Sequence, residues 1–211
     1  MNHLAVAAVC LISVRAAADA VLKPAPSVEV ADRHGRILRS AVPEDMYSVP
    51  LPLNSMSPFV VLATLGAEDR RFFEHPGVDA RAVARAAFQN AKARRTVSGG
   101  STITQQLVRA LEPRPRGLRG KISEAWRALR LEREASKSEI LEAYLNRAPY
   151  GRGALGIEAA SRTWFGVPSR DLTLGQAALL AGLPKCPSRC DPVKNPKAAP
   201  GFKKLAACGQ K

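Results

Sequence analysis

The chain of 211 residues predicts a mainly α-helical fold with a small β arm or hairpin near its N-terminus. Apolar residues recur at helical spacing over most of the chain after residue 57, and several of these stretches begin with residues that favour helix N-termini. Aromatic residues account for only 5% of the chain, and alanine is abundant. A hydrophobic content of 46% is sufficient for a buried core, and the length suits one large domain or one domain with tails.

The first 22 residues have features of a signal peptide or a membrane anchor. The apolar run from Leu4 to Val14 is too short to span a bilayer comfortably, and the alanines at 16–18 are typical of a signal-peptide cleavage site. The region before the run lacks the Lys or Arg that such signals usually contain. A cleaved signal, an imperfect anchor and a mis-started reading frame remain open, and export or anchoring is favoured.

Residues 23–56 are expected to form an N-terminal arm. This region contains many prolines, and Val28–Ala41 alternates weakly between polar and apolar residues. The turn-like residues Asp32–Arg36 lie in the middle of that segment, which favours a small hairpin or an extended strand.

The rest of the chain is expected to be helical. Ser57 should cap the first helix, in which Pro58 takes the first position and the helical pattern extends to Phe73. Another helix should begin at Asp79, and a long helix should extend over Gly117–Glu134. Further capping patterns occur at Thr102–Gln105, Ser136–Glu139 and Thr173–Gln176, and Pro184 ends the last helix.

The charge of the chain narrows the possible partners without selecting one. The formal net charge is +14 and the isoelectric point is near 10.3, so the surface should attract nucleic acid, an anionic membrane or a phosphorylated ligand. The four cysteines form no Cys-x-x-Cys pair, which argues against a zinc site. A disulfide between Cys186 and Cys190 is conceivable in an exported domain, although unpaired thiols are favoured.

The segment EDRRFFEHPG, from Glu68 to Gly77, combines carboxylates, arginines, phenylalanines and a histidine. Glu68 lies at the end of an apolar helix, where a partly desolvated carboxylate suits proton transfer as a general acid or base. Arg70 and Arg71 would counteract this effect or bind an anion, and the phenylalanines would anchor the segment. An ordinary helix end with solvated charges would explain the same residues.

The segment SGGSTITQQLVR, from Ser98 to Arg109, places two glycines and several hydroxyl groups before a helix. Exposed backbone N–H groups at a helix N-terminus bind phosphate well. The segment lacks the glycine and lysine spacing of a Walker loop. An ordinary capped helix is the alternative.

The segment RGKISEAWRALRLE contains a second candidate carboxylate. Lys121 and Glu124 are three residues apart and therefore neighbours on one helix face. We expect this pair at the rim of an apolar stripe, either as a modest surface salt bridge or as acid–base machinery opposite Glu68. The stripe consists of Ile122, Ala125, Trp126 and Leu129.

Two carboxylates, a helix end suited to phosphate and a basic surface together suggest chemistry on a sugar that carries phosphate. A plain glycosidase needs the pair of carboxylates but no phosphate site. A transferase that acts on a sugar diphosphate needs both.

Three segments match the motifs of one family completely. The pattern E-D-x-x-F-x-x-H-x-G occurs at Glu68–Gly77, G-G-S-T-I-T-Q-Q at Gly99–Gln106, and K-x-x-I-L-x-x-Y-L-N at Lys137–Asn146. Arg109 stands where many members of that family have Lys.

Two further segments match in part. The pattern R-K-x-x-E has Gly120 in place of the Arg, although Arg119 could substitute for it. In Gly153–Gly166, Trp164 replaces the usual Tyr, and directly after this segment Val167 replaces a frequent Lys. With these five segments the chain resembles the peptidoglycan glycosyltransferase domain, glycosyltransferase family 51, of class A penicillin-binding proteins and monofunctional transglycosylases. It looks most like the penicillin-binding protein 1C branch.

This resemblance implies a lysozyme-like helical fold, with a catalytic domain at 57–185 and a linker-like tail at 186–211. It implies polymerisation of lipid II into β-1,4 glycan strands with inversion and release of undecaprenyl diphosphate. Glu68 would be the general base for the acceptor hydroxyl. Glu124 would be the second catalytic acid, on the donor side.

The resemblance also assigns expected roles to ten other residues. The diphosphate would be held by Ser101, Thr102, Arg109 and Lys121, and the cleft would be lined or shaped by Gln105, Gln106, Asp69 and His75. Lys137 and Asn146 are motif residues expected to support the substrate site rather than to react. No metal site and no required cofactor are predicted, although a divalent cation such as magnesium would help to neutralise the diphosphate.

The expected partners are lipid II, the growing glycan strand and a membrane surface, at the periplasmic face of the bacterial inner membrane. Other cell-wall synthesis proteins are further candidates, and nucleic acid is not expected. Neither Ser-x-x-Lys nor Lys-Thr-Gly, both typical of an appended transpeptidase domain, occurs in the chain. A catalytically impaired or truncated relative, a lysozyme-like hydrolase and a basic nucleic-acid binder remain as alternatives.

Overall fold

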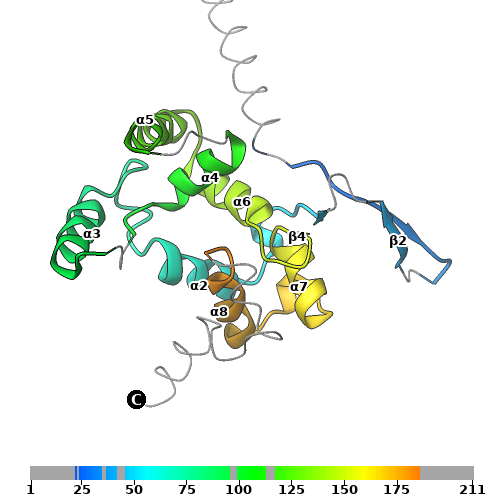
Figure 1. Ribbon diagram of the computed structural model, residues 1–211. Helices are drawn as coiled ribbons and strands as arrows, with labels where there is room; N and C mark the ends of the chain where they lie inside the picture. Colours follow the sequence, from blue (N-terminus) through cyan, green and yellow to red (C-terminus); the bar gives the residue numbers. More distant parts are fainter. Residues whose placement is uncertain are drawn as a thin grey trace, which may run out of the picture. The chain divides into compact units, whose positions relative to one another are not determined.

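The computed structural model describes residues 22, 24–34, 37–41, 46–95, 99–112 and 117–185 (Figure 1). Residues 1–21 of the predicted signal or anchor segment (residues 1–22), the tail from residue 186 and all four cysteines lie outside the described residues. The chain divides into two compact units. The first unit consists mainly of Phe72–Ala143, and the second contains Ala25–Arg71 and the chain from Tyr144 onward.

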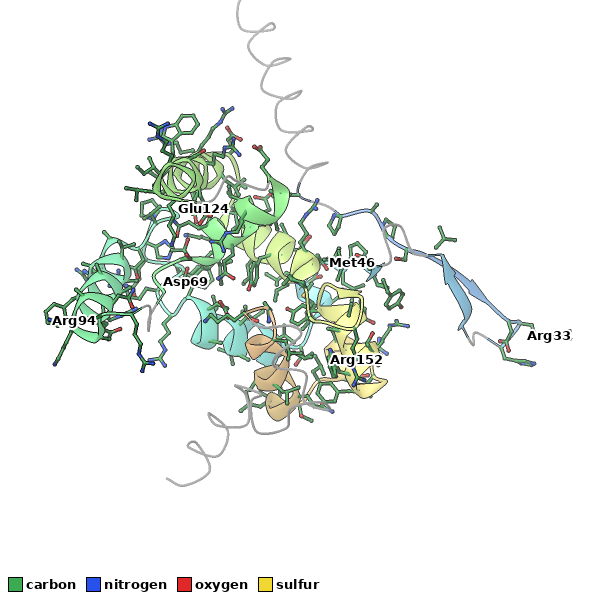
Figure 2. The ribbon with its side chains drawn as sticks, viewed as in Figure 1. Arg33, Met46, Asp69, Arg94, Glu124 and Arg152 are labelled. Carbon is green, nitrogen blue, oxygen red and sulfur yellow. The ribbon has the colours of Figure 1, made fainter. Side chains whose placement is uncertain are left out.

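The second unit contains the β-hairpin. Strand β1 (Val28–Ala31) pairs antiparallel with β2 (Ile37–Ala41), and the register shifts between Val30 and Ala31. Figure 2 shows Arg33 at the tip of this hairpin. The predicted N-terminal hairpin is therefore confirmed.

A second, smaller pair of strands lies in the same unit. Strand β3 (Tyr47–Ser48) pairs in parallel with β4 (Ala154–Leu155), far apart in the sequence. Two-residue strands have no alternating pattern, so the sequence did not predict them.

Besides the end of α6, the described part of the second unit contains the helices α2 (Pro58–Glu68), α7 (Ile157–Phe165) and α8 (Leu174–Gly182). Helix α2 packs along α8, and α7 contacts both α8 and β4 (Figure 1). A short 3-10 turn, η2 (Leu53–Ser55), precedes α2, and another, η3 (Ser169–Asp171), precedes α8. The contacting faces are buried through small and aliphatic side chains, namely Val60, Ala159, Ala160, Ala177 and Leu180.

The first unit is helical within its described residues. It contains α3 (Ala80–Ala93), α4 (Ile103–Leu111) and α5 (Leu118–Glu134), and α4 packs against α5. Helix α6 (Lys137–Arg147) begins in the first unit and ends in the second. The mainly α prediction is confirmed, and no helix among the described residues is long and apolar enough to cross a membrane.

Most predicted helix starts are confirmed by their capping bonds. The Asp79 carboxylate accepts from the Ala82 backbone N–H at 2.9 Å. Reciprocal side-chain and backbone bonds form full capping boxes at the starts of α4 and α8, and Ser136 bonds with Glu139 at the start of α6. Ser57 is the N-cap residue of α2 and Pro58 its first residue, as predicted, but the Ser57 side chain forms no capping bond, and its hydroxyl donates to the Leu172 carbonyl at 3.1 Å.

Two other details differ from the predictions. Helix α2 ends at Glu68 rather than at Phe73, because Asp69 leaves the helical conformation with φ −158° and ψ 83°. On α5, the apolar stripe that includes Ile122 and Trp126 is exposed, and Glu124 lies on the buried face. Packing of α5 against α4 buries the face with small residues, such as Ala128, instead of the stripe with large ones. The prediction that Glu124 lies at a rim was therefore wrong.

Candidate active site

The end of the first motif forms an anchored loop in the first unit. Phe72 is fully buried, and its ring meets the Phe73 ring edge-on, with centroids 5.2 Å apart. The Lys137 ammonium lies 4.4 Å from the Phe72 ring centroid. The predicted role of the phenylalanines as an anchor is confirmed for Phe72, whereas Phe73 is exposed.

Gly77 lies against the start of α4 and against α5. Its carbonyl accepts from the Thr102 hydroxyl at 2.6 Å, and its N–H donates to His75 Nδ1 at 3.2 Å. It has a φ of +97°, and a Cβ at this position would lie 2.8 Å from the Ala128 carbonyl oxygen on α5. Only glycine fits this conformation and this close approach without strain.

The start of α4 is organised by its own cap. The Thr102 N–H donates to Gln105 Oε1 at 3.0 Å, and the Gln105 N–H donates to Thr102 Oγ1 at 3.2 Å. Both side chains are buried, whereas Ser101 and Gln106 are half-buried. The accessible polar side chains at this helix end are therefore Ser101 and Gln106.

Glu124 forms a two-bond ion pair with Arg109. Nε and Nη2 of the guanidinium each donate to a carboxylate oxygen at 2.9 Å. The Glu124 side chain, which projects from α5 (Figure 2), is 2% exposed, and that of Arg109 is 43% exposed. The hydrogen bond to Glu124 raises the pKa of Arg109 further, despite the opposing effect of burial. Lys121, on the next turn towards the helix start, is exposed.

Lys137 holds together the first unit's loop and helices. Its ammonium donates to the His75 carbonyl and to Glu132 Oε1, both at 2.7 Å. The Thr104 hydroxyl donates to the same Glu132 oxygen at 2.6 Å. These contacts support the loop, α4 and α6 together. An open hollow of ≈ 470 Å³ beside them is lined by Phe73, Glu74, His75, Pro76, Leu129, Glu132, Arg133 and Lys137.

In the second unit, Glu68 ends α2 with a buried carboxylate. The side chain is 1% exposed, and the Lys185 ammonium, whose side chain is 57% exposed, lies 3.2 Å from Oε1. The Glu68 charge affects the ionisation of two buried tyrosines. Burial, and then the Glu68 charge, raise the pKa values of Tyr144 and Tyr150 above their usual range.

Asp69 and Asn146 lie in the same unit as Glu68, and both are buried. The Asn146 side-chain amide forms two hydrogen bonds with the backbone of Leu51, in the segment before α2. It accepts from the Leu51 N–H at 3.0 Å and donates to the Leu51 carbonyl at 2.8 Å. A Cβ at Gly156 would lie 2.6 Å from the Asn146 carbonyl oxygen. Asn146 therefore has a clear role in packing.

The predicted site residues fall into two groups. Glu68, Asp69 and Asn146 belong to the second unit, and the others belong to the first: His75, Ser101, Thr102, Gln105, Gln106, Arg109, Lys121, Glu124 and Lys137. Sequence reasoning missed Lys185 and Glu132, which contact Glu68 and Lys137. A single lysine after Pro184 has no distinguishing pattern, whereas Glu132 is five residues before a motif lysine. Among the described residues, no cluster of three or more His, Cys, Asp or Glu side chains could hold a metal ion.

The fold is mainly helical, and each unit contains a buried carboxylate beside a cation: Glu124 in the first unit and Glu68 in the second. A family model described as Transglycosylase matches residues 34–206. The chain therefore belongs to this transglycosylase family.

Relatives with curated descriptions are similar over most of this chain. Penicillin-binding protein 1C of Escherichia coli (strain K12) is 44% identical over 172 residues, which cover 82% of this chain and 22% of that protein. Penicillin-binding protein 2D of Bacillus subtilis (strain 168) is 43% identical over 188 residues, which cover 89% of this chain and 27% of that protein. The chain thus spans about a quarter of the length of these two relatives.

A solved structure is also similar. The match to the crystal structure of penicillin-binding protein 1A from Haemophilus influenzae covers 82% of this chain and 17% of the Haemophilus chain. The sequence identity is 21% and the TM-score is 0.42.

Proposed function

We propose that this chain is a peptidoglycan glycosyltransferase that extends a glycan from a lipid diphosphate donor. One feature shared by the two motif carboxylates carries the proposal. Glu68 and Glu124 are almost fully buried, and each contacts a partly exposed cation. Desolvated carboxylates with a neighbouring cation suit proton transfer and the stabilisation of developing charge on a sugar. Membership in the transglycosylase family supports glycosyl transfer as the type of reaction.

In the proposed reaction, Glu68 accepts the proton of the acceptor 4-hydroxyl. The oxygen of that hydroxyl attacks the anomeric carbon of the donor at the same time. The β-1,4 bond forms as the bond from the anomeric carbon to the diphosphate oxygen breaks, and undecaprenyl diphosphate leaves with the electron pair. Attack on the face opposite the leaving group inverts the configuration. Glu124, with Arg109, acts on the donor side.

The diphosphate would be bound by side chains of the first unit. A guanidinium has five N–H donors, and Glu124 takes two of those of Arg109, so that donors remain for a phosphate oxygen. Lys121 is exposed, and Ser101 is half-buried at the start of α4. Thr102 would contribute indirectly, because its hydroxyl already donates to Gly77 and shapes the helix end.

The proposed partners are lipid II, the growing glycan strand and an anionic membrane surface at the periplasmic face of the bacterial inner membrane. The net charge of +14 favours binding to such a surface and to a diphosphate lipid. Other cell-wall synthesis proteins remain candidate partners. No cofactor is proposed as essential, and magnesium could assist by neutralising the diphosphate.

Incubation of the wild-type chain with lipid II in detergent micelles tests this function directly. We expect glycan polymers, detected by gel electrophoresis of a labelled substrate, and release of undecaprenyl diphosphate. If the protein instead releases soluble muropeptides from purified sacculi and makes no polymer, it is a lysozyme-like hydrolase. If it does neither, the catalytically impaired relative is the better description.

A further inference from the structure

We propose that Lys185 is a positioning residue that holds the Glu68 carboxylate in the orientation needed for proton transfer. The inference rests on the proposed function for the role of Glu68, and the ion pair itself rests on the geometry of the second unit. Lys185 lies outside the five motifs of the sequence.

The Lys185 ammonium joins two groups at the end of α2. It lies 3.2 Å from Glu68 Oε1 and donates to the Ala67 carbonyl at 3.0 Å. The last carbonyls of a helix lack partners within the helix, and a cation near them is stabilised by the helix dipole. One ammonium therefore fixes both the Glu68 side chain and the backbone beside it.

The chain before Lys185 restricts where this ammonium can lie. Helix α8 packs along α2 and ends at Gly182, and the next residue, Leu183, is completely buried. Lys185 follows two residues later, so its backbone starts from an anchored position.

The other end of α2 is tied to the chain that leads into α8. The Ser57 N–H donates to the Ser169 carbonyl at 3.3 Å, and its hydroxyl donates to the Leu172 carbonyl at 3.1 Å. Both ends of α2 are thus bound to residues 169–185. A base carried on such a helix keeps its position better than one on a loop.

The burial of Glu68 makes its cation important. A carboxylate removed from water is costly unless a charge or several hydrogen bonds compensate it. Lys185 provides that charge from the solvent side, and the buried Tyr144 and Tyr150 are close enough to sense the carboxylate. Loss of the ammonium should let the carboxylate reorient, which impairs the chemical step more than substrate binding.

Steady-state kinetics of lipid II polymerisation with three variants tests the positioning role. We expect Lys185→Met to lower kcat about 10- to 100-fold with less than about a threefold change in KM. Lys185→Arg should recover most of the loss, because it restores the charge. Lys92→Met, at an exposed lysine of α3, should match the wild type. An unchanged kcat in Lys185→Met, a loss confined to KM, or an Arg variant as impaired as the Met variant would overturn the proposal.

A second measurement needs no substrate. Urea unfolding of the wild type, Lys185→Met, Glu68→Gln and the double variant forms a double-mutant cycle. We expect the two single effects to be non-additive, whereas additive effects would show that the pair is absent in solution and would overturn the proposal. If the wild type makes no polymer, that result counts against the proposed function, and the cycle still tests the pair.

Discussion

The guanidinium of Arg109 donates two hydrogen bonds, each 2.9 Å long, to the carboxylate of Glu124. The pair connects α4 to α5, and its carboxylate is the more deeply buried partner. Lys185 and Glu68 repeat this arrangement in the second unit, with a single contact. In both pairs a partly exposed cation compensates a carboxylate that has lost its water.

The first prediction concerns the Arg109–Glu124 pair. Arg109→Met leaves the Glu124 carboxylate buried without this partner, so we expect a loss of unfolding free energy of about 1–3 kcal/mol, less than for a fully buried pair because Arg109 is partly exposed. Urea unfolding followed by circular dichroism measures it. Arg130→Met, which breaks an exposed pair with Glu134 on the same helix, is the matched control and should leave the midpoint unchanged. Equal midpoints for the two variants would show that burial of Glu124 is unimportant.

The second prediction concerns Gly77. Gly77→Ala introduces a Cβ 2.8 Å from the Ala128 carbonyl at a φ of +97°. We expect destabilisation by about 1–3 kcal/mol, from the strained backbone and the forced shift of α5. Gly66→Ala is the control, because Gly66 lies within α2 with open space around its added Cβ, and alanine favours a helix. Thermal melting compares them, and a Gly77→Ala protein as stable as the wild type contradicts the close packing of this loop.

The third prediction concerns acid stability. Glu158 is buried, and its carboxylate accepts from the Ser169 N–H and from Arg162 Nε, both at 2.7 Å. Burial opposes its ionisation, but these partners prevail and lower its pKa below the ordinary 4.5. A lowered folded-state pKa means that the stabilisation is complete above the unfolded-state pKa and is lost as the pH falls through the folded-state pKa.

Measurements of unfolding free energy from about pH 6 down to about pH 3 test the role of Glu158. The wild type should lose stability over this range more steeply than Glu158→Gln, which has no carboxylate to protonate there. Parallel curves for the wild type and Glu158→Gln would exclude Glu158 as a source of acid sensitivity.

Local signals in the sequence predicted much of the fold. The caps at Asp79, Thr102 and Thr173 are confirmed because a short polar side chain and the following backbone N–H groups suffice to form them. Ser57 occupies the N-cap position of α2 without a side-chain capping bond, and its hydroxyl donates instead to a carbonyl 115 residues away in the sequence. Tertiary contacts of this kind leave no trace in a single sequence.

The site was predicted less completely than the fold. The motif residues were found, but the face of α5 was misassigned, because the apolar stripe with Trp126 was expected to be buried and is exposed. Hydrophobic periodicity identifies the two faces of a helix without showing which partner covers each one. Lys185 escaped notice for a related reason, since only the packing of α8 on α2 brings it to Glu68.

The most direct test of the proposed function is lipid II polymerisation by Glu68→Gln beside Glu74→Gln. Both variants replace one carboxylate in the same segment with its amide, but only the first removes the proposed base. We expect Glu68→Gln to retain the wild-type circular dichroism spectrum and to lose at least about 100-fold in polymerisation rate, whereas Glu74→Gln polymerises like the wild type. Polymerisation by Glu68→Gln at the wild-type rate would contradict the assignment of Glu68 as the base.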